Sequence, residues 1–319
     1  MFVSDCAFTN GVASMTAQLR FGLLGPVQAW YGERELELGS PQQRAVLAVL
    51  LLSNGKHVGL DELVEMLWEH DMPRSARATV RTYICRLRRE LARAAGADLR
   101  SAGGGYQLTV DPASVDVSRF RANLAGARQA HGQSDLAEAA HQLRGALALW
   151  RGAPLAGLAG TYFEGQRAGL EQLHSTAVEE QLAVRIALGE HAEAAAELAV
   201  RVAELPYRER LWELLMLSLY RSGRQAEALA TYREVAALLM RELGLEPGPG
   251  LRELHSRILC SDATLVQAVR PLESLAEGAR GHGGALTQLS APAPTPHPAA
   301  GFGDSWDGPT TWWTFPVAC

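Results

Sequence analysis

The sequence predicts a mainly α-helical protein in which a small β-containing region precedes a longer all-α region. Apolar and polar residues alternate over residues 19–39, which is the pattern of half-buried strands. Three glycines at 103–105 separate two short arms, which is a hairpin signal. From about residue 116 to residue 265 apolar residues recur at helical spacing. We therefore expect a sheet, three helices and a hairpin, followed by an all-α repeat domain.

Length and composition indicate a globular protein of about two domains. The chain has 319 residues and a formal net charge of -5. Its four cysteines lie far apart, so they predict neither a disulfide framework nor a zinc site and suit a reducing cytosol. No apolar run approaches the roughly 18 residues that a membrane span needs, and the first residues lack the pattern of a signal peptide. The expected segments are a disordered leader over 1–16, domains over 17–111 and 112–268, and a disordered tail over 269–319.

Strand signals open the first domain. Leu19, Phe21 and Leu23 alternate with Arg20 and Gly22, which predicts a strand with one buried face. Gly25-Pro26 marks a turn, and two more short strands are predicted over residues 27–30 and 35–38. Together these segments predict a small antiparallel sheet.

Three helices and a hairpin follow the sheet. Ser40 has the position of an N-cap, Pro41 of a first helical residue and Gln43 of a capping-box partner, so a helix is expected from there to about residue 52. A second, short helix is expected over about 60–68 and a longer one over 74–95. The hairpin is expected over 99–110, with glycine supplying the positive φ of a tight turn.

The all-α region contains an internal repeat. The residues GEHAEA at 189–194 recur as GRQAEA at 223–228, an offset of 34 residues, which is the period of a tetratricopeptide repeat. A weaker echo lies at 132–139, and chance similarity in an alanine-rich sequence is the alternative. The helices expected are 116–131, 134–150, 161–188, 190–204, 207–222, 224–243 and 249–260.

After about residue 271 the sequence becomes rich in proline, alanine and glycine, which predicts disorder. Four aromatic residues lie near the end of this segment: Trp306, Trp312, Trp313 and Phe315. Either they form a short docking motif or they have no role.

The helix expected over 74–95 has an apolar face and a basic face. A buried stripe is predicted around Val80: Ala76, Tyr83, Ile84, Leu87, Leu91 and Ala94. Between residues 74 and 100, eight arginines stand against two acidic residues, a local charge of +6 in a chain of charge -5. The preceding segment, residues 31–71, has eight acidic and three basic residues. The basic charge is therefore concentrated on one helix and its hairpin.

Such a helix fits the major groove of double-stranded DNA. Side chains on its outer face would reach base edges, flanking arginines would reach phosphates, and the hairpin could lie along the minor groove. The alternative is a solvated arginine-rich face, and the helix–helix–helix–hairpin order favours DNA.

Longer motifs resemble a known family. Residues 19–110 resemble the OmpR/PhoB-type winged helix-turn-helix domain, with TVRTYICRLRREL at 79–91 similar to its recognition helix and GYQL at 105–108 similar to its wing. The motifs LWRG at 149–152, LYRSGRQAEAL at 219–229 and ELGLEP at 242–247 look like the tetratricopeptide-like bacterial transcriptional activation domain. The combination over about 19–265 is that of the Streptomyces antibiotic regulatory proteins (SARPs), in their small form.

The resemblance implies a transcription activator of a secondary-metabolite (antibiotic) gene cluster. It implies two protomers in tandem on direct repeats near the promoter -35 region, recruitment of RNA polymerase holoenzyme with its sigma factor, and a cytoplasmic, nucleoid-associated location. It also implies base contacts from Arg81, Thr82 and Cys85. Phosphate or edge contacts are implied for Tyr83, Arg86, Arg88 and Arg89, and the expected DNA-binding set is completed by Arg74, Arg77 and Gln107.

Two positions depart from the family pattern. Cys85 stands where members often have Ser, and Gln107 where many have Arg. A second role for Cys85 is redox sensing, if the nearby arginines lower its pKa.

Other chemistries lack a motif. The sequence contains no GxxxxGK(S/T), HExxH or GxSxG, and its nine histidines are scattered. We therefore expect no enzyme activity, no cofactor and no metal. Two alternatives to an activator remain: a repressor of the same architecture, and a non-catalytic adaptor whose helical repeats bind a protein.

Overall fold

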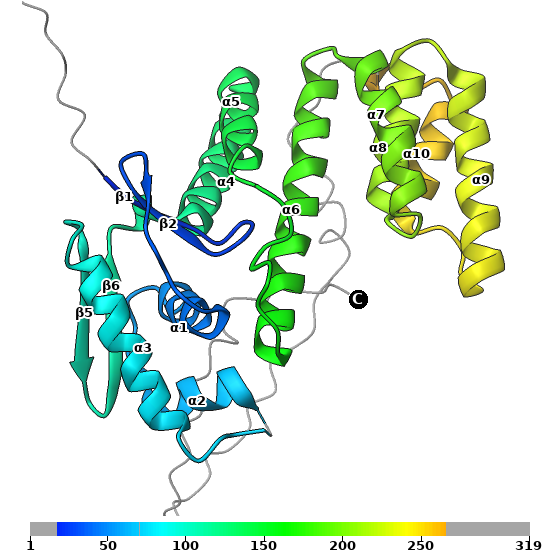
Figure 1. The fold of residues 1–319 in the computed structure, drawn as a ribbon. Coiled ribbons are helices and arrows are strands. Elements are labelled where there is room, and N and C mark those ends of the chain that lie inside the picture. Colours follow the sequence, from blue (N-terminus) through cyan, green and yellow to red (C-terminus); the bar gives the residue numbers. More distant parts are fainter. Residues whose placement is uncertain (1–17, 70, 266–319) are drawn as a thin grey trace, which may run out of the picture. The chain divides into compact units, whose positions relative to one another are not determined.

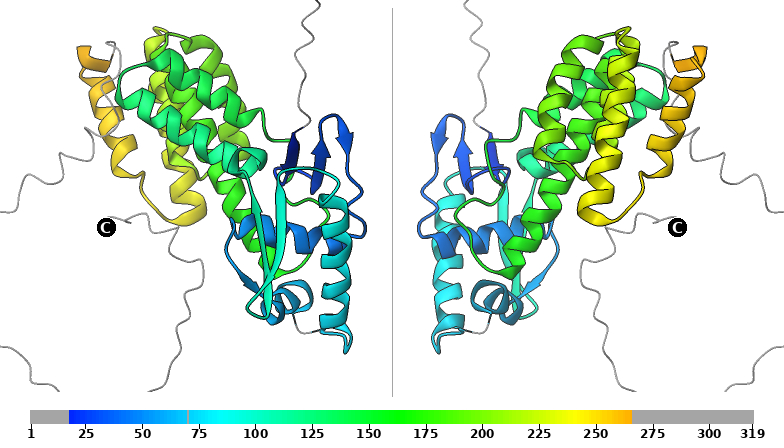
Figure 2. Two further views of the ribbon diagram at one scale, coloured as in Figure 1. Left: turned by 90° about the vertical axis from the view of Figure 1, so that its left-hand side faces the viewer. Right: turned by 90° about the vertical axis from the view of Figure 1, so that its right-hand side faces the viewer.

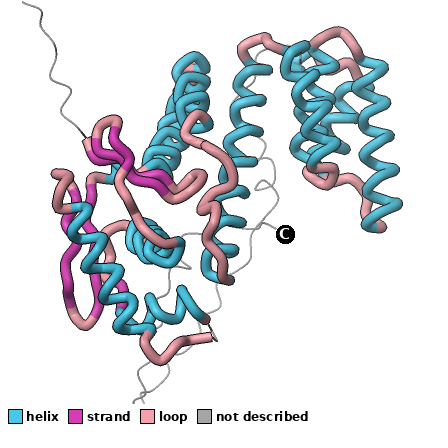
Figure 3. The backbone as a smooth tube through the Cα atoms, in the orientation of Figure 1, coloured by secondary structure: helices cyan, strands magenta, loops and turns pink. Residues whose placement is uncertain are grey.

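The computed structural model describes residues 18–69 and 71–265 (Figure 1). The expected leader over 1–16 and tail over 269–319, with its tryptophans, lie outside the described residues. Within the described chain, the strands lie in the first region and helices make up most of the rest (Figure 3). This is the mainly α-helical architecture that the sequence predicts. No helix of the described part is long and apolar enough to span a bilayer.

The first sheet has three antiparallel strands, β1 (Leu19–Gly22), β2 (Gln28–Tyr31) and β3 (Arg34–Glu35), in that order. Leu19 and Phe21 are buried, as their alternation predicts. The third strand is shorter than the one expected over 35–38. Leu36 is buried and still donates its backbone N–H to Ala29, but the strand pairing does not continue past it.

Three helices follow, α1 (Pro41–Leu52), α2 (Leu60–Trp68) and α3 (Ala76–Leu91). Ser40 Oγ accepts the N–H of Gln43 at 3.3 Å, which confirms the predicted N-cap of α1. The helix expected over 74–95 is shorter at both ends. Its last bonds are replaced by i to i−3 bonds at Arg93 and Ala94, which turn the chain toward the next strand.

The second sheet contains the expected hairpin. Strands β5 (Ala97–Ala102) and β6 (Gly105–Val110) are joined by Gly103 and Gly104, whose φ angles are +48° and +81°. Both central residues of such a two-residue turn need positive φ, which glycine adopts without strain. A two-residue strand that the sequence analysis did not predict, β4 (Val58–Gly59), pairs with β6 and gives the order β4-β6-β5.

The remaining described chain is helical, and all seven expected helices are present with ends shifted by a few residues. They are α4 (Asp116–Gly132), α5 (Leu136–Leu147), α6 (Thr161–Ala187), α7 (His191–Glu204), α8 (Glu209–Arg221), α9 (Gln225–Leu243) and α10 (Pro249–Leu259), with short 3-10 turns at Pro112–Ser114 and Ala263–Leu265. Consecutive helices pack against each other. The repeated glycines, Gly189 and Gly223, both have positive φ in equivalent turns, before α7 and α9.

Two apolar cores hold these elements. The first runs from Leu19 to Val184 and joins the strands and α1–α3 to α4–α6, and the second runs from Val178 to Leu265. Helix α6 contributes to both, since it carries Leu170 in the first core and Leu182 in the second.

A buried carboxylate lies where α4 meets the first sheet. Asp116 accepts the backbone N–H groups of Leu23, Leu24 and Val117 at 2.8–2.9 Å. Arg151 approaches the same carboxylate at 3.4 Å, donates its backbone N–H to Leu24, and places its guanidinium 4.9 Å from the ring of Trp30. Burial raises the pKa of Asp116, although the backbone hydrogen bonds and Arg151 act in the opposite direction.

Candidate nucleic-acid interface

Helix α3 presents three different faces, and the inner one matches its sequence pattern. Ala76, Val80, Ile84, Leu87 and Leu91 are all buried in the first core. Tyr83, which the pattern also placed on this stripe, is only half-buried, and its hydroxyl lies 3.3 Å from Oε1 of Gln42, to which it donates. The side of α3 that carries Tyr83 therefore faces the start of α1.

The outer face of α3 is exposed and basic. It consists of Ala78, Thr82, Cys85, Arg86 and Arg89. Thr82 donates its hydroxyl to the carbonyl of Ala78 at 3.0 Å, which leaves its oxygen available to accept. Cys85 carries a free thiol in the middle of this face. Among the described residues Arg86 has no ion-pair partner. The ion pair of Arg89 with Glu90 is long, with 3.9 Å between Nε and Oε1. Arginines on this face can therefore donate to a ligand, and binding would break few contacts within the protein.

The third face of α3 lies beside the β5–β6 hairpin, which we call the wing (residues 97–110) (Figure 2). Arg88 donates from Nε to the carbonyl of Leu99 at 3.0 Å and from Nη2 to Ser101 Oγ at 3.2 Å. Arg77 pairs with Asp61 of α2 at 2.7 Å, and both side chains are largely exposed. Arg88 thus links α3 to the wing, so its cationic group is already hydrogen-bonded to the protein.

The loop between α1 and α2 holds the other side of the wing. Gln107 donates from Nε2 to the carbonyl of Gly55 at 2.6 Å and is half-buried. A ring nitrogen of His57 lies 2.7 Å from the carbonyl of Ala102. The sequence analysis predicted a DNA contact for Gln107 and did not identify His57 as a residue that contacts the wing. The tertiary contact that directs both side chains comes from residues about 50 positions away, which no local pattern reveals.

The structure gathers most of the expected DNA-binding residues on one helix, where they are spread over its outer, wing-facing and α1-facing sides. Nine of them lie on α3 or immediately before it, where Arg74 is exposed in the preceding turn. Gln107 is separated from this set, because its amide binds the α1–α2 loop.

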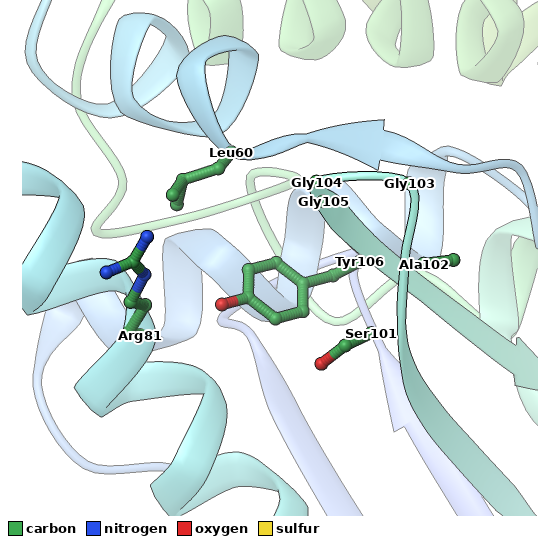
Figure 4. Close-up of a pocket in the computed structure, with 8 residues that line it drawn as sticks. All are labelled: Leu60, Arg81, Ser101, Ala102, Gly103, Gly104, Gly105 and Tyr106. Carbon is green, nitrogen blue, oxygen red and sulfur yellow. The ribbon is translucent and has the colours of Figure 1, made fainter.

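An open hollow of about 300 Å³ lies between α3 and the wing (Figure 4). Arg81 lines it from α3, and Tyr106 lines it from β6. The rest of its wall is Leu60, Ser101, Ala102, Gly103, Gly104 and Gly105. Apart from Arg81, these lining residues were not among those that the sequence singled out for binding.

Two family models match this chain in succession. Residues 33–108 match the model of "Transcriptional regulatory protein, C terminal", and residues 115–259 match that of "Bacterial transcriptional activator domain". The chain is also 33% identical over 253 residues to the regulatory protein DnrI of Streptomyces peucetius, an alignment that covers 76% of this chain and 93% of that protein. The chain belongs to the SARP family of transcriptional regulators.

Two further relatives of this SARP-family chain are longer than it. It is 46% identical over 250 residues to the regulatory protein AfsR of Streptomyces coelicolor, covering 78% of this chain and 25% of AfsR. The chain thus spans about a quarter of the length of that relative. A solved structure of Mycobacterium tuberculosis EmbR, in complex with a low-affinity phosphopeptide, aligns with a TM-score of 0.75 at 35% identity and covers 83% of this chain and 70% of that chain. That likeness supports the winged helix followed by a tetratricopeptide-like domain.

Proposed function

We propose that this protein is a sequence-specific DNA-binding transcription activator. The observation that carries the proposal is the outer face of α3, which is exposed, basic and flanked by a glycine-tipped wing. A helix of this kind fits the major groove, where Arg86, Arg89, Thr82 and Cys85 would contact base edges and nearby phosphates. The local charge of +6 over residues 74–100 would supply phosphate neutralisation in a chain that is acidic overall.

The finer proposal follows from the family. The target is a promoter of a secondary-metabolite gene cluster, bound at direct repeats near the -35 region by two protomers in tandem. The helical domain, which matches an activator model over 115–259, would recruit RNA polymerase holoenzyme with its sigma factor.

A binding assay on the protein's own site tests the DNA-binding proposal. Chromatin immunoprecipitation with sequencing would identify the site, and gel shifts would then compare it with a scrambled duplex. Arg86→Ala removes a free cation from the outer face and is expected to cost about 1–3 kcal/mol of binding free energy and to reduce the preference for the native site. Arg241→Ala is the matched control, because it removes from α9 an exposed arginine whose one ion pair among the described residues is with its neighbour Glu242.

The outcomes separate the three candidate functions. Wild-type protein that binds no duplex in preference to the scrambled one supports the adaptor. In transcription with purified polymerase holoenzyme, an activator increases the transcript from the identified promoter. A decrease that depends on the same duplex indicates a repressor.

A further inference from the structure

Arg81 faces the wing and does not point directly outward from α3. It precedes Arg88 by seven residues, and residues seven apart lie on the same side of a helix. Arg88 on that side reaches the carbonyl of Leu99 and the hydroxyl of Ser101 in β5. Consistent with this direction, Arg81 lines the hollow between α3 and the wing, opposite Tyr106 (Figure 4).

The hollow offers hydrogen-bond donors and a positive charge without an acidic residue in its wall. Within residues 18–69 and 71–265, neither the guanidinium of Arg81 nor the phenol of Tyr106 has a hydrogen-bond or ion-pair partner. Ser101 Oγ accepts from Arg88, so its own proton remains available to donate. A guanidinium with two neutral hydroxyl donors is a set that suits a phosphate oxygen.

Among the glycines that line the hollow, Gly104 lets a large group come close to the backbone of the wing. A side chain built at Gly104 would project into open space, so no residue of the described part of the chain fills that position. The volume of about 300 Å³ accommodates more than a single water-sized group.

The geometry of DNA says which group passes through this hollow. In the proposed complex α3 lies in the major groove and the wing lies along the adjacent minor groove. One sugar–phosphate strand separates those two grooves, so it must cross between α3 and the wing. Resting on the proposed function, we infer that Arg81, Tyr106 and Ser101 hold a backbone phosphate of this strand. Arg81 is therefore a phosphate contact, where the family resemblance implied a base contact.

This assignment divides the work between two faces of α3. The outer face reads bases, whereas the wing-facing side sets the depth and register of α3 by holding one strand. Loss of the Arg81 contact should weaken binding to all duplexes equally, because phosphates carry no sequence information.

A backbone-modified duplex tests the inference directly. A neutral methylphosphonate is placed at one backbone position at a time in the duplex recovered by immunoprecipitation, and affinities are measured for wild type, Arg81→Ala, Tyr106→Phe and the control Arg241→Ala. With unmodified DNA, Arg81→Ala is expected to lower affinity for native and scrambled duplexes by the same factor, roughly tenfold, and to reduce the salt slope by about one. At the phosphate between the grooves, methylphosphonate should weaken binding by wild type and Arg241→Ala markedly more than binding by Arg81→Ala, which retains only the two hydroxyl contacts. In Tyr106→Phe, which lacks only the hydroxyl, methylphosphonate at that same position should lower the affinity somewhat less than it does in wild type.

Each result decides the question. A fall in the ratio of native to scrambled affinity in Arg81→Ala would make Arg81 a base reader and overturn the assignment. Equal sensitivity of wild type and Arg81→Ala at every backbone position would also overturn it, while leaving DNA binding itself intact. If wild type shows no preference for its recovered duplex, the proposed function fails together with this inference. Because Arg81 is exposed, far-ultraviolet circular dichroism of the variant should match that of wild type, which excludes misfolding.

Discussion

At the scale of single residues, three partly buried histidines predict that the helical domain loses stability in acid. Burial lowers the pKa of His174, and Arg201 adds to the effect; the ring centroids of His174 and Trp150 are 4.4 Å apart. Burial also lowers the pKa of His191 and of His255, which stacks on Tyr232 at 3.8 Å. The folded state therefore binds these protons less readily than the unfolded state does. Their contribution to stability is full above the unfolded pKa of about 6.5 and is lost as the pH falls from that value through the lower folded-state pKa.

We predict that His174→Gln flattens part of this pH dependence. The free energy of unfolding, measured by urea denaturation, should fall between pH 7.5 and pH 5.5 in wild type and should fall less in the variant. The physical reason is that glutamine has no proton to gain on unfolding. His141→Gln, at an exposed position on α5, is the control and should keep the wild-type slope. An unchanged slope in His174→Gln would contradict the prediction.

At the scale of elements, sequence periodicity predicted long helices well and short contacts poorly. The seven helices from α4 to α10 were predictable because each repeats its apolar spacing over three or more turns. Strand β4 has two residues, which is too short for any period to show, and its existence depends on pairing with β6. The basic outer face of α3 was predictable from charge and helical spacing. The partners of Arg88 and Gln107 were not, because their acceptors at Leu99 and Gly55 are fixed by the tertiary fold.

Gly105 in the wing is packed tightly against strand β4. A Cβ atom at Gly105 would lie 2.1 Å from the carbonyl oxygen of Val58 and 2.8 Å from Cα of Gly59, both backbone atoms. Gly105→Ala should therefore disrupt the pairing of β4 with β6, cost about 1–3 kcal/mol of stability and weaken DNA binding. Thermal unfolding and gel shifts measure the two effects.

Gly165→Ala is the matched control for this experiment. Gly165 lies within α6 with open space around its Cβ position, so alanine should leave stability unchanged or raise it by up to about 1 kcal/mol. Wild-type stability and affinity in Gly105→Ala would show that the wing tolerates separation from β4.

At the scale of the whole molecule, hydrogen bonds and a shared apolar core join the region that we propose to bind DNA to the first helices of the activator domain. Asp116 at the start of α4 accepts three backbone N–H groups, two of them from Leu23 and Leu24 beyond β1. The loop after α5 adds backbone bonds to the same segment, from Arg151 to Leu24 and from Leu155 to Leu23. The first core continues across this junction, from Leu19 to Val184. These bonds and this burial argue against a free hinge between the winged helix and α4–α6.

A junction without a hinge predicts strict dependence on the spacing of two half-sites. If two protomers bind direct repeats in tandem, each helical domain should keep a fixed direction relative to its own half-site. Inserting about 5 base pairs, half a helical turn, would then rotate the second protomer to the opposite face of the DNA, and inserting about 10 would restore its alignment. Gel shifts should show cooperative binding lost with the first insertion and substantially recovered with the second, while affinity for an isolated half-site stays constant. Cooperativity that survives the half-turn insertion would mean that the junction around Asp116 bends, whereas protomers that do not contact each other would show no cooperativity at any spacing, the native one included.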